Sequence, residues 1–178
     1  MTKNNPPKNP IPPHLAANFD ALFRHGTQLL HRGKVADATP FLAQAHRLQP
    51  EHVDAGINLA GAYILSSQFK QAVAVLEPLA ETAPDNAMLW TNLGAAYLGN
   101  PVLARDAEQR RAIAAFERAL ALNPAAPSVA YNIGLIYRDR RDREQAIHWF
   151  RRAIQANPND RDARRLLQQL TDAGTDAP

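Results

Sequence analysis

One skeleton of small, apolar and turn-forming residues recurs four times along this 178-residue chain. A proline closes each copy, at intervals of 34, 40 and 34 residues: Pro50, Pro84, Pro124 and Pro158. An alanine series has the same intervals: Ala38, Ala72, Ala112 and Ala146. Because separate markers share one spacing, chance is a poor explanation. A pitch of about 34 residues is typical of a repeated helix–turn–helix unit, which must stack on its neighbours to bury its apolar face.

The third copy has the most complete set of markers. Its residues are Trp90, Leu93, Gly94 and Tyr97, followed by Ala112, Phe116 and Pro124. They match the tetratricopeptide signature W-x-x-L-G-x-x-Y, A-x-x-x-F, P, so the sequence resembles the tetratricopeptide repeat (TPR) family. The resemblance implies an all-α fold, a right-handed superhelical α-solenoid of four helix–turn–helix units plus a C-terminal capping helix.

The markers divide the chain into an arm, four units, a cap and a tail. We expect a disordered Pro- and Asn-rich arm over 1–17, units over 18–52, 53–86, 87–126 and 127–158, a capping helix over 159–171 and a tail over 172–178. The first unit is an atypical copy, because His25 stands where the family has leucine. Asp160 is the expected N-cap of the capping helix. The apolar stripe of that helix is predicted at Ala163, Leu166, Leu167 and Leu170.

Small residues predict where the two helices of a unit approach each other. Gly26, Gly94 and Gly134 share one position in the repeat, and Ala60 replaces glycine there in the second unit. Glycine costs about 1 kcal/mol relative to alanine inside a helix, so its recurrence implies a packing reason. We expect the alanine series on the facing helices, with the space beside it filled by Leu42, Leu76, Phe116 and Phe150.

The 40-residue interval places six extra residues between the two helices of the third unit. The run Gly99-Asn100-Pro101 stops a helix, and Asp106 with Gln109 has the spacing of a capping box. We therefore expect a longer turn and a second helix extended at its N-terminus. A tolerated loop insertion and a contact site for a partner are both open interpretations.

Composition excludes several classes of protein. The chain has no cysteine, which leaves no disulfide framework and no thiol metal site. The N-terminus lacks the apolar run of a signal peptide or membrane span, so we expect a cytoplasmic protein that contacts no membrane. The net charge is only +3, and acidic residues interleave with the arginines, which disfavours nucleic-acid binding. The preference for arginine over lysine and the high alanine content indicate a bacterial source.

Catalytic motifs are missing from the sequence. It has no phosphate-binding or dinucleotide-binding glycine loop, no H-E-x-x-H helix and no G-x-S-x-G elbow. The histidines are scattered, and no two are four residues apart as a helical ligand pair would be; they are His14, His25, His31, His46, His52 and His148. We therefore expect no catalytic site, no metal and no cofactor.

The family resemblance implies a concave groove lined by the first helix of each unit. The residue before the leucine of the Leu-Gly pair points into that groove, and here it is Arg24, Asn58, Asn92 and Asn132. Neighbouring groove positions are Phe23, Thr27, Ile57, Gly61, Thr91, Ala95, Tyr131 and Leu135. In the family, such asparagines hydrogen-bond the main chain of a bound peptide, since an amide both donates and accepts. An asparagine that only satisfies the repeat consensus is the alternative.

The sequence predicts a non-enzymatic scaffold that binds a peptide or helix of a partner protein in the concave groove. Carboxylate-clamp members of the family need Lys or Arg at several groove positions, but Phe23 and Met88 occupy two of them. A peptide or helix with apolar anchors fits this groove better. Two alternatives remain, a self-associating assembly scaffold that forms homo-oligomers, and a regulatory subunit of an enzyme complex that touches its partner through residues 99–106.

Overall fold

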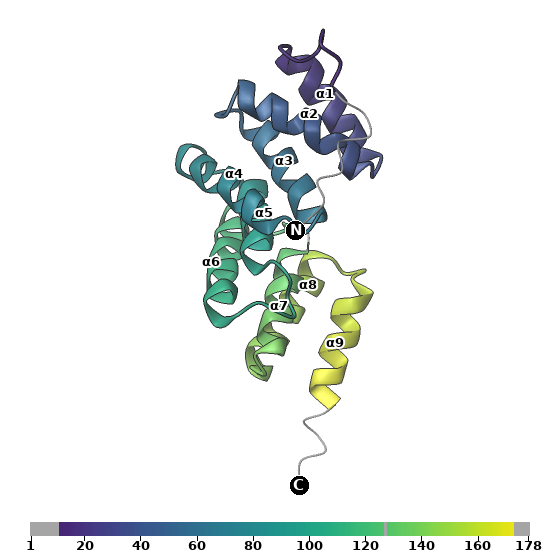
Figure 1. Cartoon of the computed structure of the whole chain (residues 1–178). Helices are drawn as coiled ribbons and strands as arrows, with labels where there is room; N and C mark the ends of the chain where they lie inside the picture. Colours follow the sequence, from purple (N-terminus) through teal and green to yellow (C-terminus); the bar gives the residue numbers. More distant parts are fainter. Residues whose placement is uncertain (1–10, 127, 173–178) are drawn as a thin grey trace. The chain divides into compact units, whose positions relative to one another are not determined.

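A computed structural model describes residues 11–126 and 128–172, and these residues form helices and turns (Figure 1). The chain divides into two compact units, Met1–Pro84 and Asp85–Pro178, and each is described by itself. The helices of the first unit are α1 (Phe19–His31), α2 (Val35–Leu48), α3 (Val53–Leu65) and α4 (Phe69–Thr82). Those of the second are α5 (Ala87–Leu98), α6 (Asp106–Leu122), α7 (Val129–Asp139), α8 (Arg143–Ala156) and α9 (Arg161–Asp172). The all-α prediction is confirmed for these residues.

Consecutive helices pack as pairs, and the predicted small residues lie where the helices of a pair meet. A Cβ atom built on Gly94 of α5 would lie 2.5 Å from Cδ1 of Phe116 on α6. A Cβ atom built on Gly134 would likewise lie 2.8 Å from the Phe150 ring, and one built on Gly26 would lie 2.8 Å from Cγ of Leu42. Phe116, Phe150 and Leu42 are fully buried, as are all four alanines of the marker series. The predicted packing role of the glycines is therefore confirmed.

Three of the turns within pairs share one conformation. In each, the middle residue has a positive φ: 71° at Gly33, 57° at Ser67 and 61° at Arg141. The next residue then donates its backbone N–H to a carbonyl five residues back, as Lys34 does to Leu29 at 2.9 Å. These are the bonds of a Schellman motif, which satisfies carbonyl groups left open at a helix end. Glycine suits this position because it lacks a Cβ, and only the first of the three turns has it.

Side-chain caps begin five of the helices that the structure describes. Asn18, His52, Asn86, Asp142 and Asp160 each accept a hydrogen bond from a backbone N–H three residues ahead. Asp160 accepts from Ala163 at 2.9 Å, so its predicted role as N-cap of α9 is confirmed. Ala163 and Leu166 are buried beneath α9, whereas its arginines are exposed, which gives this helix the amphipathic character expected of a cap.

The predicted capping box at Asp106 and Gln109 is wrong by one residue. Arg105 is the N-cap of α6, and its backbone N–H donates to Glu108 Oε2 at 2.7 Å. The Arg105 guanidinium also hydrogen-bonds Glu108, which lowers the pKa of that carboxyl. The sequence pattern placed the start too late because a side chain at N3 can reach back to any N-cap residue's N–H, whatever that residue's own side chain is.

The extra residues of the third pair are divided between a loop and a helix. Residues 99–105 link α5 to α6, whereas three residues link the helices of the other pairs. The second helix α6 has 17 residues, compared with 14 in α8. The longer turn and the longer second helix are thus both present.

Residues 11–17 differ from the expected disordered arm, which otherwise falls outside the described residues. Backbone hydrogen bonds from Leu15 to Pro12 and from Ala16 to Pro13 close two consecutive turns. Ile11 and Leu15 pack against a buried cluster of unit 1 formed by Leu22, Phe41 and Ala45. The local sequence is rich in proline and weakly apolar, so only this tertiary contact explains its order.

Candidate functional site

In unit 1, the predicted groove residues lie on α1 and α3. Phe23 and Thr27 are four residues apart on α1, as are Ile57 and Gly61 on α3, so each pair shares a helix face. Asn58 Nδ2 on α3 donates to Thr27 Oγ1 on α1 at 2.9 Å. The bond joins two half-buried side chains that the sequence assigned to one surface. Beyond this bond, an asparagine amide has a second N–H and a carbonyl oxygen with which to contact a ligand.

Phe23 belongs to an aromatic cluster at the same place. Its ring centroid lies 5.7 Å from that of Phe19 and 5.3 Å from that of His52. The His52 ring is fixed by a capping bond, because His52 is the N-cap of α3 and its Nδ1 accepts a hydrogen bond from the Ala55 N–H at 3.3 Å. A surface depression of about 380 Å³ is lined by Phe23, Arg24 and Thr27, together with Asp20 and Gln28. The structure therefore brings three predicted residues of α1 to one concave surface.

The two remaining predicted residues of α3 differ in their environments. Ile57 is only 4% exposed, so it supports the fold and cannot offer its side chain to a partner, contrary to the sequence-based assignment. Gly61 is half-buried, and a Cβ atom built on it would meet nothing within 4 Å. The surface beside Gly61 is therefore open at the scale of a methyl group.

In unit 2, the predicted residues lie on α5 and α7. Thr91 Oγ1 donates to the carbonyl of Ala87 at 2.9 Å, so its hydroxyl is directed to its own helix. Ala95, Tyr131 and Leu135 are partly buried against the core of the unit. Asn92 and Asn132 are half-buried and occupy the same position in the repeat as Asn58. The apolar members of this set thus serve the core as well as the surface.

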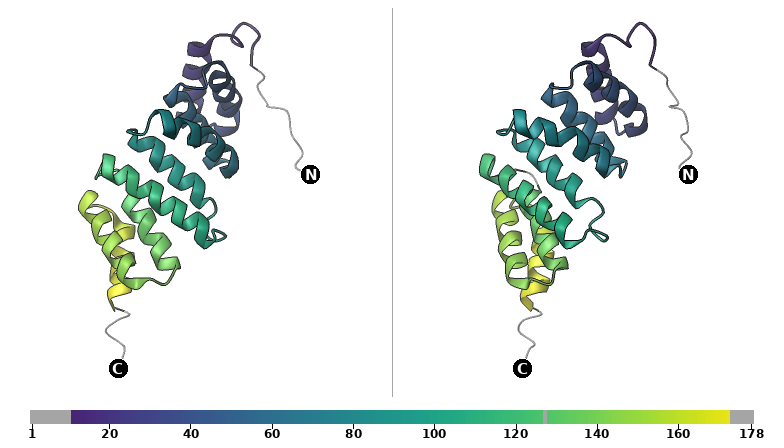
Figure 2. Two further views of the ribbon diagram at one scale, coloured as in Figure 1. Left: turned by 90° about the vertical axis from the view of Figure 1, so that its left-hand side faces the viewer. Right: turned by 60° about the vertical axis from the view of Figure 1, so that its left-hand side comes forward.

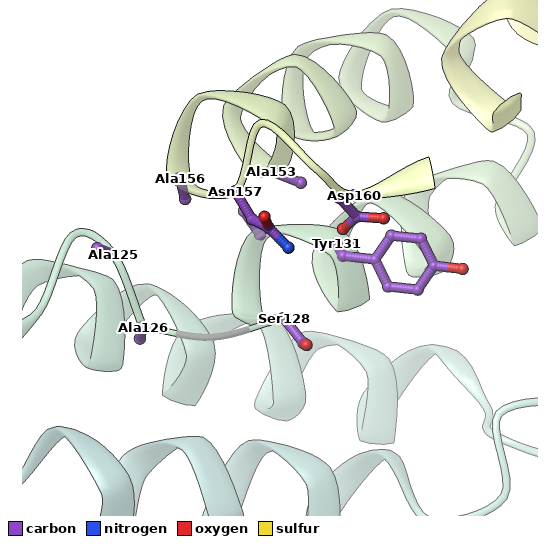
Figure 3. Close-up of a pocket in the computed structure, with 9 residues that line it drawn as sticks. Ala125, Ala126, Ser128, Tyr131, Ala153, Ala156, Asn157 and Asp160 are labelled. Carbon is purple, nitrogen blue, oxygen red and sulfur yellow. The ribbon is translucent and has the colours of Figure 1, made fainter. Parts of the chain in front are cut away.

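Tyr131 lines a cavity that sequence reasoning missed (Figure 3). Its volume is about 280 Å³, and five alanines line it together with Ser128, Tyr131, Asn157 and Asp160. The Tyr131 ring and the Asp160 carboxylate lie on the same side of it (Figure 3). The lining residues come from two turns and the helices beside them, so no single periodic pattern marks them in the sequence.

The environment of Tyr131 keeps its hydroxyl protonated. Burial raises the pKa of Tyr131, and the nearby carboxylates of Asp162 and Asp160 raise it further. Arg138 and Arg165 oppose this effect. A neutral phenol is a hydrogen-bond donor, and the lining also holds the side chains of Ser128 and Asn157 and the Asp160 carboxylate, which accepts the capping bond of α9.

Several arginines of the C-terminal half are paired with acids. Arg140 bonds Asp106 at 2.7 Å and Arg138 bonds Asp139 at 2.7 Å. Within residues 11–126 and 128–172, no group of three or more His, Asp or Glu side chains is arranged to hold a metal ion. Across the same part of the chain, none of the helices combines the length and apolar character needed to cross a membrane.

Comparisons with known proteins agree with the repeat pattern. Two tetratricopeptide repeat family models match residues 29–96 and 103–161, which together make up more than half of the chain. No curated protein is significantly similar in sequence.

Several solved structures resemble this one. A crystal structure of MamA is 19% identical over 91% of this chain and 84% of its own, with a TM-score of 0.74. TTC0263, a TPR protein of Thermus thermophilus, is 20% identical over 87% of this chain and 82% of its own, with a TM-score of 0.72. YrrB, a TPR protein with an unusual peptide-binding site, is 20% identical over 86% of this chain and 76% of its own, also with a TM-score of 0.72. These likenesses concern the fold, and they confirm the predicted all-α solenoid class.

Proposed function

The chain belongs to the tetratricopeptide repeat family, and we propose that it is a non-enzymatic scaffold that binds a peptide or helix of a partner protein. TPR proteins are in general protein-interaction scaffolds. The proposed contact surface of unit 1 is the face of α3 that carries Asn58, and that of unit 2 is formed by the faces of α5 and α7 that carry Asn92 and Asn132. YrrB, which has a similar fold, has a peptide-binding site, and this supports the proposal by analogy.

The observation that carries the proposal is the bond between Asn58 and Thr27. It fixes the amide of Asn58 in one orientation at 2.9 Å from Thr27 Oγ1, so little side-chain freedom is lost when a ligand binds. The depression lined by Phe23 and Arg24 lies on the same helix as Thr27. An apolar anchor of the peptide would contact the Phe23 ring while the amide bonds the peptide main chain.

A display selection against the intact chain tests this proposal by supplying a defined peptide. The dissociation constant of that peptide would be measured for the wild type and for the triple variant Asn58→Ala, Asn92→Ala, Asn132→Ala. Each lost hydrogen bond is worth about 0.5–1.5 kcal/mol, so the triple variant should bind at least tenfold more weakly.

A matched control replaces exposed side chains of second helices, Gln71→Ala and Gln155→Ala, and should leave the affinity unchanged. Far-UV circular dichroism would establish that every variant keeps its helices. A triple variant that is folded and binds the peptide as tightly as the wild type does would refute the asparagine role.

A specific observation favours a second candidate, a regulatory subunit that contacts an enzyme through the long turn. Val102 is 90% exposed and Leu103 is 75% exposed. The turn is ordered, because Asn100 accepts from Val102 N–H through its side chain and from Leu103 N–H through its main chain, both at 3.0 Å. Two aliphatic side chains held in water in this way are suited to an apolar site on a partner.

The variant Val102→Ser with Leu103→Ser separates the two candidates. The display-selected peptide should bind this variant with the wild-type affinity, because the turn is distinct from the helix faces that carry Asn58, Asn92 and Asn132. A protein partner purified with the intact chain should bind it at least tenfold more weakly if the turn contacts that partner, since burying one aliphatic side chain contributes about 1.5–3 kcal/mol. Equal affinity of that partner for both proteins would remove the second candidate.

A further inference from the structure

The cavity beside Tyr131 lies in unit 2 where the turn before α7 meets the turn before α9. Figure 2 shows α9, in yellow, beside the green helices α7 and α8, and all three share one core cluster. Three lining alanines, Ala126, Ala130 and Ala153, are buried, whereas the polar side chains of the lining belong to half-buried or exposed residues. The cavity therefore has an apolar interior and a polar mouth. It is called the Tyr131 cavity below.

Asp160 carries the one charge among the described residues that line the Tyr131 cavity. Its Oδ1 accepts the capping bond of α9 at 2.9 Å, and a carboxylate has a second oxygen that can accept further bonds. The nearest arginines are bonded to other acids, Arg165 to Asp162 at 3.1 Å and Arg138 to Asp139 at 2.7 Å. Within the described part of the chain, no ion pair joins Asp160 to an arginine or lysine. This half-buried carboxylate can therefore take a cation from a ligand.

The Tyr131 ring adds a second group that attracts a cation. It lies on the same side of the cavity as the Asp160 carboxylate (Figure 3). The face of an aromatic ring attracts a cation that comes within about 6 Å of its centroid. The raised pKa of Tyr131 agrees with this, because the carboxylates of Asp162 and Asp160 act on the ring more strongly than Arg138 and Arg165 do. A positive group is thus favoured at this place.

Asn157 supplies a hydrogen-bond donor at the mouth of the cavity. Its Oδ1 accepts from the Asn159 N–H at 3.1 Å, which fixes which end of the amide carries the nitrogen. Figure 3 shows the amide end directed towards Ser128 and Tyr131. The amide N–H groups can donate to a main-chain carbonyl of a peptide that passes over the mouth.

We propose that the Tyr131 cavity is a subsite for one lysine or arginine side chain of the partner peptide, with the cationic end against Asp160 and Tyr131 and the carbon stem against the alanines. The inference rests on the proposed function, since it specifies a residue of that peptide. Tyr131 precedes Asn132 on α7, so a side chain of a peptide bound at Asn132 can reach the cavity. Pockets that hold whole small molecules measure about 300–1,000 Å³, and the 280 Å³ of this cavity suits a single side chain. Lysine and arginine bury a carbon stem in this way and keep the charged end at the water boundary.

A small probe tests the subsite without the peptide. n-Butylguanidinium, which has the end and part of the stem of an arginine side chain, would be titrated into the intact ¹⁵N-labelled chain. The side-chain NH₂ signal of Asn157 and the backbone amide signal of Ala126 should shift saturably in NMR spectra. n-Butylurea has nearly the same shape without the charge, so it should bind at least tenfold more weakly.

The variant Asp160→Asn removes the charge and leaves the fold, because asparagine caps a helix as well as aspartate does. It should bind n-butylguanidinium at least tenfold more weakly than the wild type does. Asp142→Asn is the matched control, since Asp142 is the N-cap of α8, at the opposite end of a 14-residue helix about 21 Å long. This control should bind the probe as the wild type does. Ala156→Leu, which fills the cavity at an exposed lining position without changing the charge, should also weaken binding at least tenfold.

The display-selected peptide provides the second readout. Each of its lysines and arginines would be replaced in turn by methionine, and one replacement should weaken binding to the wild type at least tenfold. The same replacement should have little effect on binding to Asp160→Asn, because the two changes remove one interaction.

The inference is overturned if n-butylguanidinium does not bind, if n-butylurea binds equally well, or if Asp160→Asn binds the probe as the wild type does. It is also overturned if the peptide needs no basic residue, even where the triple asparagine variant has lost the peptide; the proposed function then stands without this subsite. The opposite failure is distinguishable, because a peptide whose affinity ignores the three asparagines would refute the asparagine role while the probe still bound beside Asp160.

Discussion

Replacing Gly94 by alanine should destabilise unit 2, although alanine is the better helix former. Gly94 lies inside α5, and the added Cβ would be 2.5 Å from Cδ1 and 2.6 Å from Cε1 of Phe116. Carbon atoms pack best about 3.5–4.0 Å apart, so the overlap is about 1 Å. The ring of Phe116 is fully buried and cannot swing into solvent to relieve it.

The magnitude follows from two opposing contributions. Alanine gains about 1 kcal/mol over glycine in a helix interior. Overpacking a close-packed core costs about 1–3 kcal/mol and sometimes more, and an overlap with an immobile ring belongs at the upper end. We therefore expect a net loss of about 1–2 kcal/mol in the free energy of unfolding. At Gly61, where a Cβ would meet nothing within 4 Å, alanine should keep its full gain of about 1 kcal/mol.

Urea unfolding followed by circular dichroism would measure both variants against the wild type. A double-mutant cycle makes the cause specific: the loss caused by Gly94→Ala should shrink when Phe116 has already been replaced by leucine, because the smaller side chain leaves room for the methyl group. If Gly94→Ala stabilises the protein as much as Gly61→Ala does, the close-approach explanation of this recurring glycine is refuted.

Two further predictions concern unit 1. Burial lowers the pKa of His46 below its ordinary 6.5, with Glu51 opposing, and its buried Nδ1 has no hydrogen-bond partner among the described residues. The unfolded chain therefore binds the proton more readily, so the His46 contribution to stability is full above pH 6.5 and decreases as the pH falls towards the folded-state pKa. The urea midpoint of the wild type should therefore drop between pH 7.5 and pH 5.5, and His46→Gln should reduce that drop. An unchanged drop in the variant would contradict this. Ser67→Gly should stabilise by about 1 kcal/mol in urea unfolding, because a left-handed φ of 57° strains any residue with a Cβ, whereas a loss of stability would show that this strain is absent.

Contacts that depend on the repeat register could be predicted from the sequence. The approach of Gly94 to Phe116 is an example, because both residues hold fixed places in a helix pair and the pair geometry repeats along the chain. The Asp160 cap is another, since an N-cap bond spans only three residues. In both cases a short-range pattern carries the whole of the information.

Contacts outside that register could not be predicted. The groove positions implied by the family resemblance placed Ile57 on a surface, yet the surrounding side chains bury it. A repeat position gives the direction in which a side chain leaves its helix, but not whether other side chains cover it. The cavity beside Tyr131 was missed for a related reason, because it forms where separate turns meet and its alanine lining resembles any helix surface in sequence.

The sequence by itself determined the helical class, the four-fold repetition and the small and aromatic residues that join each helix pair, because these follow from the 3.6-residue period and a pitch of about 34 residues. Only the tertiary structure decided how the departures from the repeat are used. Gln44 Nε2 donates to the carbonyl of Ala16, 28 positions away, and the Thr27–Asn58 bond joins residues 31 apart. Such contacts depend on how helices pack against one another, and a local pattern of residues does not predict that packing.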